Sequence, residues 1–347
     1  MLAKKQNREY YDAFTQRNSE YEGVFFTGIK TTGIFCRPTC VARIPKFENC
    51  DFFKDTKTAI LAGYRPCKRC RPLSPPFAIT ELVQTLIDAV ENEPDKRWNE
   101  DTFKTLGVDA STVRRQFKKR FGMTFVAYAR AKRMGLAMDQ LKNGESVINA
   151  QIDSGYQSGS GFRDAFLKLM DHAPNTAHHQ VFKAEWLDTK LGPMISIVDH
   201  EKLYLLEFTD RPGLDLEVQK LREKFNAAIV PGRESVTDLI DHELQDYFAG
   251  RLKKFETPVH LTGTTFQNEV WSVLQTIPYG HTWSYQQLAT QLGNKNAFRA
   301  VARANATNQM PIIIPCHRVV HKNGNLAGYS GGLVRKKWLI NHEQSFA

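Results

Sequence analysis

The middle of the chain carries apolar residues at helical spacing. Between residues 78 and 92 they recur roughly every 3.6 positions, which predicts an amphipathic helix. The basic stretch 111–122 has the form of the second helix of a helix-turn-helix unit, with Gly122 as its stop. Ser158 can cap a further helix of the same kind. Each could be an ordinary solvated helix, but two of them joined by the apolar-patterned 125–141 favour a paired reader of the DNA major groove.

Short apolar runs separated by turn residues follow in the second half of the chain. Residues 194–198 and 202–208 predict a strand hairpin, and 215–225 predicts a helix. The alanine-dense segment 299–306 predicts a thin helix, because alanine is the strongest helix former. The isoleucines at 312–314 end at a Pro-Cys-His sequence. This order predicts a buried segment with a thiol at its rim.

Length and composition indicate a multidomain globular protein. A chain of 347 residues is long for one hydrophobic core and predicts about two to four domains, with the Pro-rich 71–76 as a linker. No apolar stretch of about 20 residues occurs, so no membrane span is expected. The N-terminus lacks the apolar segment of a secretory signal. We therefore expect a reducing cytoplasm, where closely spaced thiols bind metal or act in catalysis more often than they form disulfides.

The net charge of +10 is distributed unevenly. Residues 101–150 carry ten Lys and Arg against four Asp and Glu, and 263–347 carry eight against two. Between them, 191–262 carries nine against thirteen. Two basic blocks that flank an acidic one predict two separate surfaces for a polyanion, with nucleic acid as the leading partner. The acidic block is expected to have a structural role.

Two pairs of cysteines near the N-terminus have the spacing of a metal site. Cys36 and Cys40 form one pair, and Cys67 and Cys70 form the other. Two such pairs supply the four sulfurs of a tetrahedral zinc site, and the spacing alone favours a structural role for it. Cys50 lies between the pairs without a partner at ligand spacing and is expected to be a packed free thiol.

The pair Cys316-His317 has two interpretations when it is taken alone. A cysteine beside a histidine is most often a core cysteine next to a solvent-facing imidazole. It can also be a nucleophile, because a neighbouring base or positive field produces the reactive thiolate.

Three groups of motifs resemble one known family. The motif segments are 31–38 with 63–70, then 117–124 and 155–166, and finally 284–289, 299–301, Asn308 and 314–319. The first group resembles the zinc domain of the Ada family, the second resembles the two helix-turn-helix units of AraC-type regulators, and the third resembles the O6-alkylguanine-DNA alkyltransferases. That order of modules is the Ada arrangement, and the resemblance covers nearly the whole chain.

The resemblance implies a multidomain α+β fold. The four expected parts are a zinc-binding methylphosphotriester-acceptor domain over 1–73, an all-α AraC-type double helix-turn-helix domain over 77–182, an α/β subdomain over 190–260, and a helical, winged-helix-like alkyltransferase domain over 263–347. It also implies a monomer in the bacterial cytoplasm, associated with the nucleoid, with double-stranded DNA and RNA polymerase as partners.

In the C-terminal third, the resemblance implies methyl transfer from O6 of guanine, and also from O4 of thymine, to Cys316. His317 would draw off the thiol proton through a water, and Glu343 would orient the imidazole and balance its charge. Asn308 would hold the connecting turns together. Tyr285 would donate a proton or hydrogen bond to the departing base. The thioether product is not readily hydrolysed, so each molecule is expected to react once.

The same resemblance assigns residues that contact DNA. Arg299 would fill the base stack that a flipped nucleotide leaves, and Tyr329 and Ser330 would belong to the loop that walls the base pocket. In the zinc domain, the matching positions are Thr32, Arg43 and Arg65.

Cys36 is implied as a second methyl acceptor, from a methylated backbone phosphate. Four thiolates on one Zn²⁺ leave a net charge of −2, which keeps the sulfurs nucleophilic, and methylation of one sulfur makes the charge −1. Less negative charge facing phosphate would strengthen DNA binding and turn the chain into a transcriptional activator of the response to alkylation.

The chain departs from the family pattern at a few positions, most of them in the helix-turn-helix half. Val41 replaces a basic residue, and Thr102, Phe103, Phe125 and Asp171 also differ from the usual residues. Two rival functions stay open at this point. One is a zinc-dependent AraC-type regulator whose C-terminal domain is inactive or only a sensor, and the other is a cysteine hydrolase.

Overall fold

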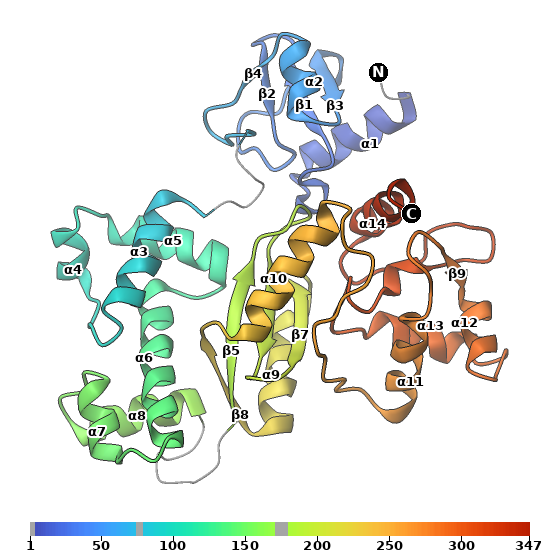
Figure 1. The fold of residues 1–347 in the computed structure, drawn as a ribbon. Coiled ribbons are helices and arrows are strands. Elements are labelled where there is room, and N and C mark those ends of the chain that lie inside the picture. Colours follow the sequence, from blue (N-terminus) through green and yellow to red (C-terminus); the bar gives the residue numbers. More distant parts are fainter. Residues whose placement is uncertain (1–3, 74–78, 171–179) are drawn as a thin grey trace.

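The computed structural model describes residues 4–73, 79–170 and 180–347, and Figure 1 shows their arrangement. The N-terminal part is a small four-stranded sheet of order β3-β1-β2-β4 beside the helix α1. Its elements are α1 (Lys4–Thr15), the 3-10 turn η1 (Ser19–Tyr21), β1 (Phe26–Ile29), β2 (Ile34–Cys36), η2 (Phe47–Asn49), β3 (Cys50–Phe53), α2 (Thr56–Leu61) and β4 (Arg65–Pro66). The short strand β4 runs parallel to β2, which brings the second cysteine pair beside the first.

A helical region follows. Its elements are α3 (Glu81–Asn92), α4 (Glu100–Thr105), α5 (Ala110–Phe121), α6 (Phe125–Lys142), α7 (Val147–Asp153) and α8 (Gly159–Met170). The predicted helix stops and caps are confirmed. Gly122 ends α5 in the left-handed conformation with φ 73°, and the Ser158 hydroxyl accepts the backbone N–H of Gly161 at 3.2 Å.

The unusual residues of the first helix-turn-helix unit fit its core. Phe125, at the start of α6, is 1% exposed and packs its ring 4.8 Å from Trp98 and 5.7 Å from Phe103. Thr102 completes a capping box with Asn99 at the start of α4. Phe103 and Phe125 therefore belong to one aromatic core, and Thr102 caps the helix beside it. Asp171 lies outside the described residues.

A second four-stranded sheet, of order β7-β6-β5-β8, occupies the centre of the molecule (Figure 1). Its elements and the helices that follow are β5 (Gln180–Leu187), β6 (Met194–Val198), β7 (Leu203–Phe208), α9 (Leu214–Phe225), β8 (Ala227–Pro231) and α10 (Ser235–Phe248). The predicted hairpin corresponds to β6 and β7. The strands β5 and β8 were not predicted, and β5 crosses the boundary expected at residue 182 because it pairs with both β6 and β8.

Both faces of the central sheet are covered. On one face, Trp186 of β5 packs edge-on against Phe121 of α5 at 4.8 Å, and a Cβ on Gly135 of α6 would lie 2.8 Å from the Val230 side chain. On the other face, apolar side chains such as Leu206 share a core with Ile240 of α10 and with the C-terminal helices. The sheet therefore joins the helix-turn-helix region to the C-terminal region.

The C-terminal region is mainly helical. Its elements are α11 (Thr265–Leu274), β9 (Trp283–Ser284), α12 (Tyr285–Gln291), α13 (Phe298–Ala306), the 3-10 turn η3 (Cys316–Arg318), β10 (Val319–Val320) and α14 (Leu333–Ser345). The alanine-dense helix was predicted and corresponds to α13. In the described parts of the chain, no helix combines the length and the apolar character that a membrane crossing requires.

Candidate active site and metal centre

The backbone that carries Cys316 is tightly turned. Ile312 has φ +79°, a conformation that β-branched residues rarely adopt and that costs roughly 1–3 kcal/mol. Pro315 forms an inverse γ-turn, in which the N–H of Cys316 donates to the carbonyl of Ile314 at 2.7 Å. The isoleucine run is thus buried, as expected, but it forms a turn that delivers the thiol and not an extended strand.

Asn308 holds this turn and contacts the thiol directly. Its Nδ2 donates to the carbonyl of Ile314 at 2.8 Å and to Cys316 Sγ at 3.0 Å. Its Oδ1 accepts the N–H of Met310 at 3.0 Å. Asn308 is fully buried, so these hydrogen bonds fix both the turn and the direction of the sulfur.

The imidazole of His317 is fully buried beside a carboxylate. His317 Nε2 lies 2.8 Å from Glu343 Oε1 of α14, and both side chains are at most 1% exposed. A carboxylate only accepts, so Nε2 carries the hydrogen and Nδ1 is the basic nitrogen. Among the described residues, Nδ1 has no hydrogen-bond partner. This tautomer leaves a free proton acceptor on the residue that follows the thiol.

Sequence reasoning missed most of the support for Glu343. Arg318 binds the carboxylate through two nitrogens, Nε at 2.8 Å and Nη2 at 3.0 Å, and the Tyr247 hydroxyl donates to it at 2.9 Å. Burial acts to raise the pKa of Glu343, but His317 and Arg318 together lower it below its ordinary value. The position of Arg318 directly after His317 could have indicated its contact with Glu343. Tyr247 lies 96 positions from Glu343 along the chain, and no sequence motif connects the two residues.

Burial sets the protonation state of the two central groups. It raises the pKa of the Cys316 thiol to about 11, although the hydrogen bond from Asn308 and the charge of Lys336 act in the opposite direction. It also lowers the pKa of His317 below 6.5, against the influence of Glu343. At neutral pH the resting site therefore holds a thiol beside a neutral imidazole, a pair suited to general-base activation.

A buried lysine lies close to the thiol. Lys336 of α14 is 0% exposed, and its Nζ donates to the carbonyl of Val319 at 2.6 Å. Burial lowers its pKa to about 8, and the charge of Cys316 limits that shift. This contact could not be predicted from the sequence, because a lysine on a terminal helix is usually exposed.

The other residues expected around the thiol lie at different depths. Tyr285, at the start of α12, is half-buried, and burial followed by the charge of Cys316 raises its pKa. The same two causes raise the pKa of Tyr329, whose hydroxyl has no partner among the described residues. Ser330 is half-buried beside it, whereas Arg299 is exposed on α13. The tyrosines thus approach the thiol, and Arg299 faces solvent.

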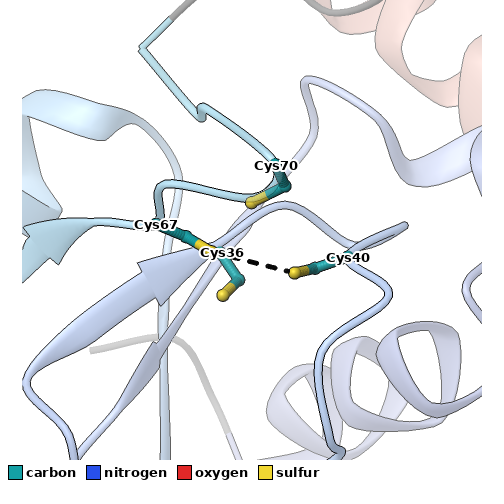
Figure 2. Close-up of side chains that lie close together, drawn as sticks. All are labelled: Cys36, Cys40, Cys67 and Cys70. Carbon is teal, nitrogen blue, oxygen red and sulfur yellow. Dashed lines mark hydrogen bonds between the residues drawn. The ribbon is translucent and has the colours of Figure 1, made fainter. Parts of the chain in front are cut away.

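The four predicted metal ligands come together. Figure 2 shows Cys36, Cys40, Cys67 and Cys70 with their sulfur atoms around one point, and the sulfurs all lie within 4.8 Å of one another. Sulfurs at about 2.3 Å from a tetrahedral Zn²⁺ are about 3.8 Å apart, so the cluster fits one zinc ion. Cys50 is buried outside the cluster, as expected.

A buried ion pair supports the loop between Cys36 and Cys40. Arg37 Nη1 lies 3.1 Å from Glu22 Oε2, and Arg37 Nε donates to the carbonyl of Cys70 at 3.0 Å. Its backbone N–H donates to Cys70 Sγ at 3.4 Å. Glu22 also accepts from the N–H of Thr39 at 3.3 Å and from its hydroxyl. These contacts fix the first cysteine pair against the second, and the sequence motifs did not include Glu22.

The expected DNA contacts of this region are exposed. Thr32, Arg43 and Arg65 all lie on the surface. Thr32 and Arg65 are close, because the N–H of Arg65 donates to the carbonyl of Gly33 at 2.7 Å. Val41 is 68% exposed on the same loop as Arg43 and adds no charge there.

One basic residue of the predicted recognition helix is not available to DNA. The Arg120 side chain is only 8% exposed and pairs with Asp188 at 2.8 Å. It anchors the end of α5 to the segment that follows β5. Arg114, Arg115 and Lys118 remain exposed on the helix.

Comparison with known families divides the chain in the same order. Residues 9–72 match the metal binding domain of Ada, 103–180 match a helix-turn-helix domain, and 265–345 match the DNA binding domain of 6-O-methylguanine DNA methyltransferase.

Similar proteins cover either most of the chain or about half of it. The bifunctional transcriptional activator/DNA repair enzyme Ada of Escherichia coli (strain K12) is 34% identical, and the match covers 94% of this chain and 93% of that protein. A methylated-DNA–protein-cysteine methyltransferase of Shigella flexneri is 40% identical over 46% of this chain and 94% of its own length. The crystal structure of Mycobacterium tuberculosis O6-methylguanine methyltransferase is 36% identical over 48% of this chain and 94% of that one, with a TM-score of 0.42.

Proposed function

The chain belongs to the Ada family of DNA-repair methyltransferases and transcriptional activators, and we propose that Cys316 and Cys36 are its two methyl acceptors. It is a methylated-DNA–protein-cysteine methyltransferase with a zinc site and a DNA-binding regulatory half. The observation that carries the assignment of Cys316 is its environment. A buried thiol accepts a hydrogen bond from Asn308 and is followed by a histidine whose free nitrogen is Nδ1.

The transfer at Cys316 is a single displacement. His317 Nδ1 accepts the thiol proton through a water, while its Nε2–H continues to donate to the Glu343 carboxylate. The sulfur attacks the methyl carbon, so that an S–C bond forms while the bond from carbon to guanine O6 breaks. Glu343 balances the imidazolium without taking its proton, because Arg318 and Tyr247 keep the carboxylate ionised.

The departing guanine leaves with the electron pair of the broken bond. Tyr285 supplies the proton that neutralises the departing guanine. The proton held by His317 then returns to Tyr285 through solvent. In the net reaction, the sulfur gains the methyl group and the guanine gains the hydrogen that the thiol has lost. Tyr329 and Ser330 wall the base pocket, and Arg299, exposed on α13, fills the vacated stack. The thioether that remains on Cys316 has no leaving group, so the site is used once.

At the N-terminal site, Cys36, Cys40, Cys67 and Cys70 hold one zinc ion. The bound metal keeps the sulfurs ionised and nucleophilic at neutral pH. We propose that Cys36 accepts a methyl group from a backbone methylphosphotriester, with DNA bound through the exposed residues Thr32, Arg43 and Arg65. The loss of one negative charge at the site then strengthens DNA binding and switches the chain to an activator.

The domain limits and remaining partners are part of the proposal. The expected limits were 1–73, 77–182, 190–260 and 263–347. Because β5 pairs with β6 and β8, we propose that the third domain begins at Gln180, where β5 starts, and that the second ends before it. The chain acts as a monomer on double-stranded DNA of the bacterial nucleoid, in the cytoplasm, and contacts RNA polymerase when it activates transcription.

Mass spectrometry tests the proposal. The protein is incubated with a duplex that bears one O6-methylguanine, and the intact mass and cysteine peptides are measured beside Cys316→Ser. A gain of one methyl group on Cys316, absent in the variant, is expected. An unchanged mass with intact zinc would instead support a regulator whose C-terminal domain is inactive. Turnover of an acyl substrate at Cys316 would support a hydrolase.

A further inference from the structure

The segment Ser19–Tyr21, with Glu22 after it, lies between the two proposed methyl acceptors. It forms the turn η1 of the N-terminal part and contacts α14 of the C-terminal part. Figure 1 shows the N-terminal part next to α14. Asn18 caps the turn, because its side chain accepts the N–H of Glu20 at 2.9 Å. The turn is therefore a defined element and can transmit a change of position.

One side of this turn contacts the end of the base-pocket loop. The Ser19 hydroxyl donates to Asp210 Oδ2 at 3.2 Å. The Glu20 carboxylate lies directly against Gly332, because a Cβ there would come within 2.5 Å of it. Gly332 is the residue before α14, and α14 has no acidic residue in its own first turn and no side-chain cap. A negative charge near the N-terminus of a helix interacts favourably with the helix dipole. Glu20 therefore supplies, from another domain, the acidic group that the first turn of α14 lacks.

The contact continues from Asp210 to the pocket loop. Asp210 binds the two terminal nitrogens of the Arg335 guanidinium, each at 2.9 Å, and Arg335 is only 2% exposed. Arg335 also donates to the carbonyl of Gly331 at 3.2 Å. The carbonyl of Tyr329 accepts the N–H of Gly332 at 3.0 Å. The backbone of residues 329–332 is therefore held by Arg335, and Arg335 is held by Asp210, the residue that Ser19 of η1 contacts.

The other side of the turn contacts the zinc site. Glu22, the next residue, binds Arg37 at 3.1 Å and accepts from Thr39. Both partners lie between Cys36 and Cys40, and Glu22 is 3% exposed. Four consecutive residues thus touch the base-pocket loop at one end and the loop of the first methyl acceptor at the other.

We propose that residues 19–22 couple the two methyl-acceptor sites: docking of Ser19 and Glu20 orders the pocket loop 329–332, and the state of Cys36 reaches that loop through Glu22. The coupling rests on the proposed function, because it concerns the reactivity of the same two cysteines. It adds that methyl transfer to Cys316 in the full chain depends on the zinc domain, whereas three independent modules would not affect one another.

The first test removes the contact. Ser19→Ala/Glu20→Ala is compared with the wild type and with Glu48→Ala, which removes an exposed carboxylate of the same domain away from the interface. We expect single-turnover transfer to Cys316 at saturating DNA to slow by about fivefold or more, DNA affinity to stay within about twofold, and amides 329–336 to exchange faster. Zinc content of one per chain verifies that the variant is folded.

The second test changes the state of Cys36. The full chain is treated with a duplex carrying a methylphosphotriester, or with the same duplex unmodified, and amide exchange over 329–336 is measured. We expect methylation to change exchange there in the wild type and in Glu48→Ala, but not in Ser19→Ala/Glu20→Ala.

Each result decides between outcomes. Transfer rates within twofold of wild type together with unchanged exchange in the double variant would overturn the coupling, and so would exchange that is insensitive to methylation in the wild type. A wild-type chain that transfers no methyl group to Cys316 would overturn the proposed function instead. In that case the exchange of 329–336 in the double variant still decides whether the turn orders the loop.

Discussion

The two cysteines proposed as methyl acceptors have opposite kinds of surroundings. Cys316 is a lone thiol whose burial raises its pKa to about 11, so it depends on a base at the moment of reaction. Cys36 lies among three other sulfurs, and the four together fit a zinc ion. A bound metal lowers the pKa of a cysteine thiol, so that the thiolate would form without a base. The same residue type is thus activated by proton removal at one site and by metal binding at the other.

The rate of transfer at Cys316 should depend on pH in a way that identifies the base. A thiol attacking without a base would react about tenfold faster per pH unit until its pKa is passed. The pKa of His317 lies below 6.5, so the neutral imidazole persists above that pH and accepts the proton throughout. We expect a nearly level single-turnover rate from neutral pH up to about pH 8, where Lys336 begins to lose its charge, and a decline at acid pH, where His317 becomes protonated. A tenfold rise per unit over the same range would contradict a role for His317.

Replacement of Arg318 should destabilise the C-terminal domain. The side chain shares the buried Glu343 carboxylate with His317 and also donates to the carbonyl of Ile277 at 2.6 Å. Removing one partner of a buried ion pair leaves a charge uncompensated and costs about 3–5 kcal/mol. We expect Arg318→Gln to lower the free energy of unfolding in urea by that order, with the exposed Arg303→Gln near wild type. Equal stability of the two variants would contradict this account.

At the scale of elements, the central sheet accounts for several features of the sequence. Strands β6 and β7 are buried along their whole length, because helices cover both faces of the sheet. Strands of this kind appear in a sequence as continuous apolar runs, which made the hairpin predictable. In β5, buried and half-exposed positions alternate over part of the strand, and its polar residues hid it from a search for apolar runs.

Phe125 tests the interpretation of the helix-turn-helix core. Its ring packs against three aromatic side chains, Trp98, Phe103 and Phe117, at the start of α6. Removing such a ring from a filled core costs about 3–5 kcal/mol. We expect Phe125→Ala to lower the unfolding free energy of this region by that order, whereas Leu136→Ala, 40% exposed on the same helix, changes little. If Phe125→Ala proved as stable as Leu136→Ala, the aromatic core would have to be described differently.

In the whole molecule, the two proposed acceptors, Cys36 and Cys316, lie on opposite sides of one interdomain contact. The turn η1 contacts α14, and the helix-turn-helix region packs on the central sheet through pairs such as Arg120 with Asp188. The modules are therefore in contact with one another, which permits a signal at one site to affect another.

Zinc removal should separate the roles of the two ends of the chain. The zinc domain has a small core, and a four-cysteine site usually supplies much of the folding free energy of such a domain. We expect a chelator to raise amide exchange over 24–70, to abolish methylation of Cys36 and to slow transfer to Cys316 by the same factor as Ser19→Ala/Glu20→Ala. Full protection of 24–70 after verified metal loss would contradict this.

The sequence alone determined the features that depend on local chemistry. The spacing of Cys36, Cys40, Cys67 and Cys70 identified the metal site, because two ligands within one turn must reach the same ion. Helix periodicity, Gly122 and Ser158 identified the helix-turn-helix helices and their ends for the same local reason. Family resemblance assigned the thiol and its histidine from the motif around Cys316, and Glu343 from the C-terminal segment 338–343.

Only the tertiary structure decided how these parts act on one another. Tyr247, Lys336 and Glu22 lie outside the motifs and contact residues of the two sites that are 96, 17 and 15 positions away, and the sequence does not encode such contacts directly. Whether a charged side chain is buried also depends on what packs over it, as Arg120 illustrates. The contact of Glu20 with Gly332 is of the same kind, because it exists only when two domains meet. Local patterns therefore identified the chemistry, whereas packing sets the protonation states of the buried groups and makes the contacts through which we propose that the two sites are coupled.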